Sequence, residues 1–134
     1  MKAINDVAEA RATALSLHSL LSTAIDTMST VVYTSRMFTV LRTDEFKAWS
    51  AGLRDLKALA RIDARIRRAE MGNLGDVKSV GGGVGEMRID YGPGYRLYFT
   101  RRGLELIVLL CGGDKRTQTA DIKRAQKMVA ELED

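Results

Sequence analysis

The sequence predicts a single α+β domain, in which helices pack on a small, mainly antiparallel sheet. Two segments, 85–91 and 95–100, alternate apolar and polar residues on either side of a Gly-Pro-Gly stretch, as the strands of a hairpin do. The segment 104–111 is almost wholly apolar, which is typical of a strand covered on both faces. Two further segments, about 53–71 and 122–132, carry apolar residues at helical spacing.

Length and composition limit the kinds of protein that this chain can be. Its 134 residues suit one domain with a core large enough to stand alone, and 46% hydrophobic content argues against wholesale disorder. A net charge of +4 and a pI near 9.4 permit anionic partners such as nucleic acid or an acidic protein. One cysteine, Cys111, and one histidine, His18, exclude an internal disulfide and the usual thiol or His-pair metal sites. We therefore expect a cytoplasmic protein without a metal ion or cofactor.

Residues 1–36 are predicted to be an N-terminal extension, helical or partly disordered, of a domain at 37–134. Acids and bases balance in the extension, so the positive excess lies in the domain. Its apolar residues recur every three or four positions, on one face of an amphipathic helix, and no apolar run reaches the roughly 18 residues of a membrane span. Two interpretations stay open: a helix that docks on the domain or a partner, and the favoured one, an upstream extension before a true start at Met28 or Met37.

The first half of the domain predicts a strand followed by two helices. The apolar segment 38–41 suggests a short strand, and Thr43 can cap a helix whose first turn carries two acids. The second helix, about 53–71, ends at Gly72 and Asn73, as a C-cap requires.

The polar face of this second helix is basic. Its cations recur at three or four residues: Arg54, Lys57, Arg61, Arg65 and Arg68. A stripe of this kind is either a solvated face or a surface that follows phosphates or contacts an acidic protein, and both interpretations stay open.

The second half predicts the hairpin, the buried strand and a last helix. The glycine-rich segment 81–85 lacks the Lys-Ser/Thr of a phosphate loop and precedes a strand, so we interpret it as a flexible turn. Gly112 and Gly113 end the buried strand. The last helix buries four apolar residues, which are Ile122, Ala125, Val129 and Leu132.

The hairpin is predicted to close on the three-residue loop 92–94. This register pairs Asp90 with Arg96 and Arg88 with Tyr98, and it places the polar residues of both strands on one face. The Asp90–Arg96 pair would be a surface ion pair, and on spacing alone it is the favoured interpretation of these residues.

The functional alternative is a basic phosphate site on that polar face. Its five candidate residues are Arg88, Arg96, Tyr98, Lys115 and Arg116. Each guanidinium offers paired donors that match two phosphate oxygens, so the set suggests phosphate binding without a metal ion. In RNA cleavage by the neighbouring 2′-hydroxyl, these cations would stabilise the charge that grows on the phosphorus, while the lysine or the tyrosine moved protons.

Several separate motifs follow one another along the domain. They are Arg61-Ile62 with Arg65-Ile66, GNLGDVK (72–78), GVGEMRI (83–89), YGPGYRLYF (91–99) and LLCGGDK (109–115). In this order they closely resemble the HigB-like addiction module killer branch of the RelE/ParE toxin superfamily, over about residues 37–132.

The resemblance implies a RelE-like fold, with two N-terminal helices packed on a small twisted sheet and a C-terminal helix. It implies the toxin of a type II toxin–antitoxin system, neutralised by a cognate helix-turn-helix antitoxin, that cleaves mRNA in the ribosomal A site and arrests growth. Such a toxin would be a metal-independent endoribonuclease with the ribosome and mRNA as partners, and it would not bind a membrane.

The resemblance also assigns site residues. Arg96 in the Tyr-Arg motif matches a catalytic basic position, Arg116 matches another, and Arg88 matches less closely. The tyrosine expected at the start of the final helix is replaced by Ile122. The sequence does not choose among the possible proton carriers, which are Tyr98, Tyr91 and Lys115. The basic stripe and Tyr91 are the expected surface for RNA or the antitoxin.

Two other functions stay open at this point. One is a ParE-like inhibitor that binds DNA gyrase and performs no chemistry. The other is a degenerate toxin that acts only as an antitoxin-binding co-repressor.

Overall fold

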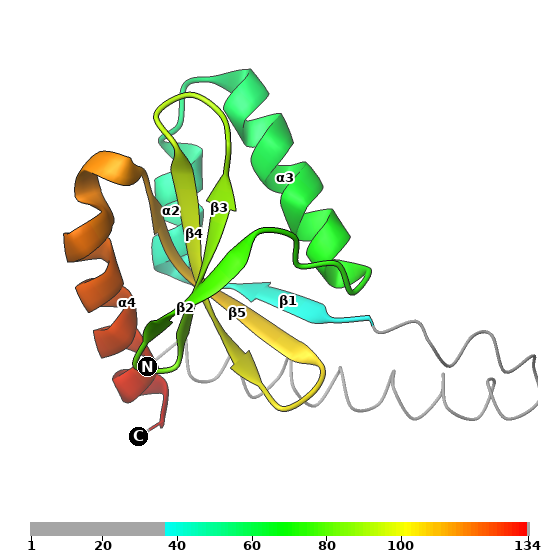
Figure 1. Cartoon of the computed structure of the whole chain (residues 1–134), viewed down its shortest axis with the longest axis vertical. Coiled ribbons are helices and arrows are strands. Elements are labelled where there is room, and N and C mark those ends of the chain that lie inside the picture. The colour runs from blue at the N-terminus through cyan, green and yellow to red at the C-terminus, as the bar shows by residue number, and fades with distance from the viewer. Residues whose placement is uncertain (1–36, 134) are drawn as a thin grey trace, which may run out of the picture.

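The computed structural model of the chain describes residues 37–133, which form three layers (Figure 1). In chain order the elements are β1 (Thr39–Arg42), α2 (Asp44–Ala51), α3 (Leu56–Glu70), β2 (Val77–Gly81), β3 (Val84–Ile89), β4 (Tyr95–Arg102), β5 (Leu106–Gly113), the 3₁₀ helix η2 (Lys115–Thr117) and α4 (Gln118–Glu133). The strands form one sheet in the order β1-β5-β4-β3-β2. Helices α2 and α3 cover one face of the sheet and α4 covers the other. The expectations for residues 1–36 lie outside the described part.

The predicted α+β class is confirmed, and the strand predicted at 38–41 is β1. The expectation that came with the resemblance, two helices at the N-terminal end of the fold, differs from the structure, because β1 precedes them and pairs in parallel with β5, which makes the sheet mixed. Thr43 caps α2 as predicted, and its hydroxyl accepts from the Phe46 amide at 3.1 Å. Helix α3 begins only at Leu56, because Asp55 caps it, so Arg54 lies before the helix.

Strand β2 is not among the predicted elements. It is an edge strand whose residues are exposed or only partly buried, so it lacks the apolar alternation that marks β3 and β4. The glycine-rich segment is a turn, as predicted, and it is a tight one. Gly82 and Gly83 have φ angles of +63° and +78°, the left-handed conformation that a two-residue hairpin turn needs.

The predicted register of the β3–β4 hairpin is wrong by two residues. Arg88 pairs with Arg96, so residues 90–94 form a five-residue loop and the Asp90–Arg96 ion pair does not form. The loop is wider because Tyr91 is held outside the ladder. Its hydroxyl donates to Asp55 at 3.0 Å, and its ring lies 4.6 Å below the Arg61 guanidinium. A shift of two residues leaves every side chain on its predicted face.

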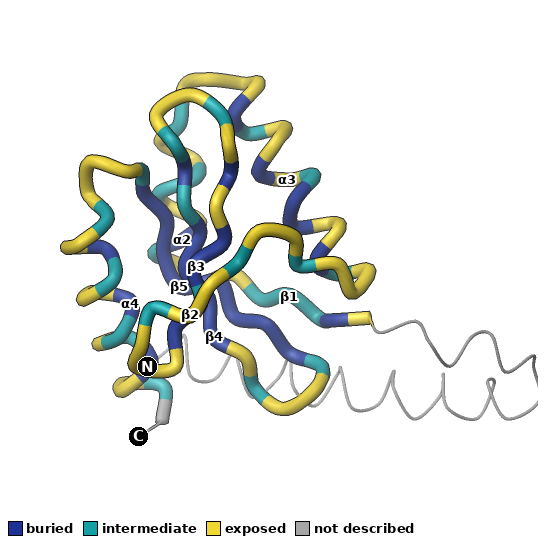
Figure 2. Tube along the Cα trace, in the orientation of Figure 1, coloured by how far each residue is buried: buried dark blue, intermediate teal, exposed yellow. Residues whose placement is uncertain are grey.

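The predicted buried strand is confirmed as β5, an interior strand whose residues are all buried (Figure 2). Ile107 and Leu109 face the core beneath α2 and α3, whereas Val108 and Leu110 face the core beneath α4. This double burial explains the unbroken apolar sequence.

Helix α2 packs so closely on β5 that no side chain fits at Gly112. A Cβ there would overlap the Trp49 ring, which also contacts the rings of Phe46 and Tyr95. The glycine therefore serves close packing in ordinary strand backbone.

We expect Gly112→Ala to displace Trp49 and lower the free energy of unfolding by about 1–3 kcal/mol, as overpacked cores do. Gly52→Ala is the matched control, because a Cβ there would meet nothing closer than the Trp49 carbonyl oxygen at 3.5 Å, and it should stay within about 0.5 kcal/mol of the unaltered chain. Urea unfolding measures both. If both substitutions lowered the free energy of unfolding equally, the close contact between Gly112 and Trp49 would be contradicted.

Candidate functional site

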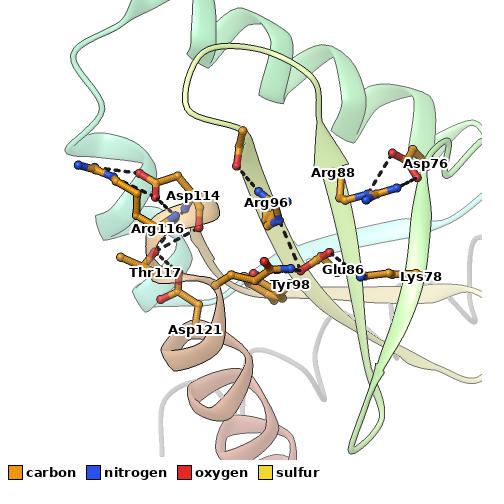
Figure 3. A network of polar contacts seen from close by, with 12 residues as sticks. Asp76, Lys78, Glu86, Arg88, Arg96, Tyr98, Asp114, Arg116, Thr117 and Asp121 are labelled. Atoms are coloured by element: carbon orange, nitrogen blue, oxygen red, sulfur yellow. Dashed lines mark hydrogen bonds and ion pairs between the residues drawn. The ribbon is translucent and has the colours of Figure 1, made fainter.

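Two arginines stand directly opposite each other near the hairpin end of the sheet. Arg88 on β3 and Arg96 on β4 are register partners, so both side chains project from the face that α4 covers (Figure 3). Like charges in this arrangement repel each other. Each arginine is accordingly paired with a carboxylate from a different place.

The carboxylate near Arg96 belongs to Glu86, which is 0% exposed. Its Oε2 accepts hydrogen bonds from the Tyr98 hydroxyl (3.2 Å) and the Gln118 side-chain amide (2.8 Å). The same oxygen lies 3.7 Å from Nε of Arg96, and Oε1 lies 3.9 Å from Nζ of Lys78. We call these five residues the Glu86 cluster, of which Lys78, Glu86, Arg96 and Tyr98 are labelled in Figure 3.

Arg96 is held at two points. Its Nη1 donates to the Gly94 carbonyl at 2.7 Å, and its side chain is only 11% exposed. The other amino nitrogen, Nη2, has no hydrogen-bond partner within residues 37–133. A Cβ at Gly94 would lie 3.1 Å from Nη1 and 3.7 Å from Cβ of Lys115, so Lys115 sits just across Gly94 from Arg96. Lys115 is exposed and makes no ion pair or hydrogen bond with the described residues.

Arg88 and Arg116 form exposed ion pairs instead. Nε and Nη2 of Arg88 each lie 3.2 Å from a carboxylate oxygen of Asp76, and this hydrogen bonding raises the pKa of Arg88. Arg116 donates to Asp114 at 3.0 Å, which holds the pKa of Asp114 below its ordinary value, and its side chain is directed away from Arg96 (Figure 3). Exposed pairs of this kind contribute little to stability.

The two candidate tyrosines are not placed to carry protons at this site. Tyr98 is fully buried, and burial together with the neighbouring Glu86 raises its pKa. Its role is that of a neutral donor within the Glu86 cluster. Tyr91 lies on the α3 side of the hairpin loop, where the hydrogen bond to Asp55 raises its pKa. Ile122 is a partly buried residue of the core beneath α4.

The basic stripe of α3 contains one residue that faces inward. Lys57, Arg61 and Arg68 are exposed, as is Arg54 in the preceding turn. Arg65 is instead buried, and burial lowers its pKa.

Arg65 binds backbone, not a ligand. Its guanidinium donates to the carbonyls of Arg88, Leu74 (3.0 Å) and Asp76 (3.3 Å). It therefore fixes the backbone of Arg88 and of the residue that pairs with the Arg88 side chain. Helical spacing alone could not separate Arg65 from its exposed neighbours.

We expect Arg65→Ala to lower the free energy of unfolding by about 2 kcal/mol or more, because each buried carbonyl left without a donor costs ~1–3 kcal/mol. The matched control is Arg68→Ala, the same substitution at an exposed position of the same helix, which should change stability by less than about 0.5 kcal/mol. Thermal and urea unfolding report both values. An Arg65→Ala protein as stable as the control would show that the three hydrogen bonds to carbonyls do not contribute to the free energy of unfolding.

Other chemistry has little support in the described part of the chain. Within residues 37–133 no group of three or more His, Cys, Asp or Glu side chains is arranged to hold a metal ion, and no helix is long and apolar enough to cross a membrane. Cys111 is buried opposite Tyr98, and burial raises the pKa of its thiol to about 11. A thiol in this state is a poor nucleophile.

Fold and site together define a small α+β protein with a cluster of basic side chains at one end of its sheet. No protein-family model matches the chain. An uncharacterized protein of Haemophilus influenzae is 51% identical to it over 87 residues, which is 65% of this chain and 88% of that protein. The chain belongs to the same protein family as this relative. Because the relative's description states no activity, substrate or partner, function rests on the geometry of the site.

Proposed function

We propose that this protein is the toxin of a type II toxin–antitoxin pair, with a RelE-like fold, that cleaves ribosome-bound mRNA without a metal ion or cofactor. The observation that carries the proposal is the facing pair Arg88 and Arg96, with Lys115, which has no ion pair within residues 37–133, across Gly94. Three cations from separate elements thus lie near one end of the sheet, and in the proposed reaction they engage one phosphodiester. The helix-turn-helix antitoxin and a cytoplasmic location belong to the same proposal.

In this reaction the 2′-hydroxyl oxygen of the RNA attacks the adjacent phosphorus, and its proton passes to water. The bond from phosphorus to the 5′-oxygen breaks, leaving a 2′,3′-cyclic phosphate and a 5′-hydroxyl. Arg96 and Arg88 bind the two non-bridging oxygens, where negative charge grows. Lys115 donates a proton to the departing 5′-oxygen, because Tyr98 is buried and Tyr91 is bound to Asp55.

The exposed cations of the stripe, Arg54, Lys57, Arg61 and Arg68, add a second positive surface along and just before α3. We assign it to backbone phosphates of RNA or to acidic side chains of the antitoxin, since exposed lysine and arginine serve either.

One observation favours a second candidate, an antitoxin-binding co-repressor without catalysis. Both candidate tyrosines are engaged elsewhere, and Ile122 stands where the resemblance requires a tyrosine. In such a protein no proton is transferred, and the basic face would serve binding alone.

To test the function, the full chain is induced in a bacterial host and transcript ends are mapped. We expect growth to stop and new ends to appear within translated mRNAs. Arg96→Ala should lower cleavage about 100-fold or more, because removal of one charge-stabilising donor has that effect. Arg101→Ala is the matched control, because Arg101 also lies on β4 but stacks on Phe38, 5.0 Å from the ring centre.

Two outcomes would contradict the nuclease, and a third would change the assignment of its site. Arrest with intact transcripts, linearised plasmid and a DNA damage response would indicate gyrase inhibition. An absence of toxicity would indicate the co-repressor. Full cleavage by Arg96→Ala would remove Arg96 from the site.

A further inference from the structure

Glu86 takes no part in the chemistry above, yet it is a fully buried carboxylate at the centre of the polar contacts around the site. We propose that Glu86 is a positioning residue, whose negative charge holds the Arg96 guanidinium in the orientation that receives a phosphate. This inference rests on the proposed function for its catalytic consequence. The orientation itself can be measured without catalysis.

The surroundings of Glu86 suit a negatively charged side chain. Lys78, Glu86 and Tyr98 are successive register partners, so they form one row across β2, β3 and β4, and Arg96 lies one step along β4 on the same face. Burying a carboxylate is costly unless cations and donors surround it. Here two cations and two neutral donors converge on it from both neighbouring strands and from Gln118 of α4.

Arg96 needs this anchor because its surroundings would otherwise displace it. Its register partner is another arginine, Arg88, and the two guanidinium groups repel each other. The Gly94 carbonyl fixes only Nη1. The buried Glu86 carboxylate attracts the guanidinium at Nε and so opposes the repulsion by Arg88. It leaves Nη2 of Arg96 without a partner among the described residues.

The two roles of the carboxylate, packing and charge, can be separated by one substitution. In Glu86→Gln the amide oxygen can still accept from Tyr98 and Gln118, so the shape and these hydrogen bonds persist. What disappears is the attraction for Arg96 and for Lys78, whose side chain is 53% exposed and can turn to solvent. Glu45→Gln is the matched control, because Glu45 pairs with Arg124 (3.1 Å) where α4 meets α2, and neither residue belongs to the Glu86 cluster.

The experiment compares full-length wild type, Glu86→Gln and Glu45→Gln by ¹⁵N NMR of arginine side chains and by cleavage kinetics on ribosome-bound mRNA. We expect the Arg96 Nε–H signal, identified by its loss in Arg96→Ala, to be sharp in wild type and Glu45→Gln but shifted and broadened in Glu86→Gln. We expect Glu86→Gln to lower kcat by ten- to a hundred-fold with KM changed less than three-fold. In an Arg96→Ala background the Glu86→Gln change should have less than a two-fold effect, since the anchored residue is gone.

An unchanged Arg96 signal, or an unchanged kcat in Glu86→Gln, would overturn the inference while the proposed function stood. Failure of the proposed function would appear differently, as a wild type that does not cleave, and the NMR comparison would then decide on Glu86 alone. If Glu86→Gln does not fold, Glu86→Asp retains the charge and withdraws it by one methylene. That variant should still shift the Arg96 signal, and wild-type behaviour would overturn the inference.

Discussion

The buried charge of Glu86 constrains the whole end of the sheet that carries the candidate site. A carboxylate without solvent must be surrounded by cations or hydrogen-bond donors. Here the cations are Lys78 from β2 and Arg96 from β4, and the donors are Tyr98 from β4 and Gln118 from α4. The Glu86 cluster therefore connects β2 and β3 at the edge of the sheet to β4, and it connects all three strands to the start of α4. Of the cations near the site, Arg96 and Lys78 lie beside this buried anion.

A second buried ion holds the same region from the opposite side of the sheet. Arg65 reaches from α3 to the carbonyls of Arg88 and Asp76, so the backbone of the exposed Arg88–Asp76 pair is fixed by a cation on the α3 side. Arg96 is fixed by an anion on the α4 side. The two facing arginines are thus supported independently, and this arrangement keeps like charges adjacent despite their repulsion.

Local pattern was enough to predict the α+β class, the Thr43 cap, the buried strand and the shared face of Arg88 and Arg96. The face of the sheet on which each side chain lies could be predicted, because a register error of two residues does not move a side chain to the other face. The register itself could not, since it depends on Tyr91 reaching Asp55, 36 positions earlier in the chain. Glu86 looked like one more polar residue of an exposed strand face, and Arg65 like one more cation of an exposed helix. Only the packing of α4 and of the loop after α3 buries them.

We propose a mechanism in which the cations of this face act on an RNA phosphodiester attacked by its own 2′-hydroxyl. The most direct test is cleavage of a ribosome-bound mRNA carrying a single 2′-deoxynucleotide immediately 5′ of the mapped cut, in the presence of a chelator that leaves the ribosome intact. We expect this mechanism to yield a 2′,3′-cyclic phosphate and a 5′-hydroxyl from the unmodified mRNA, and to leave the substituted mRNA whole at that position. Cleavage of the substituted mRNA at the same bond, or a 3′-hydroxyl product, would contradict it.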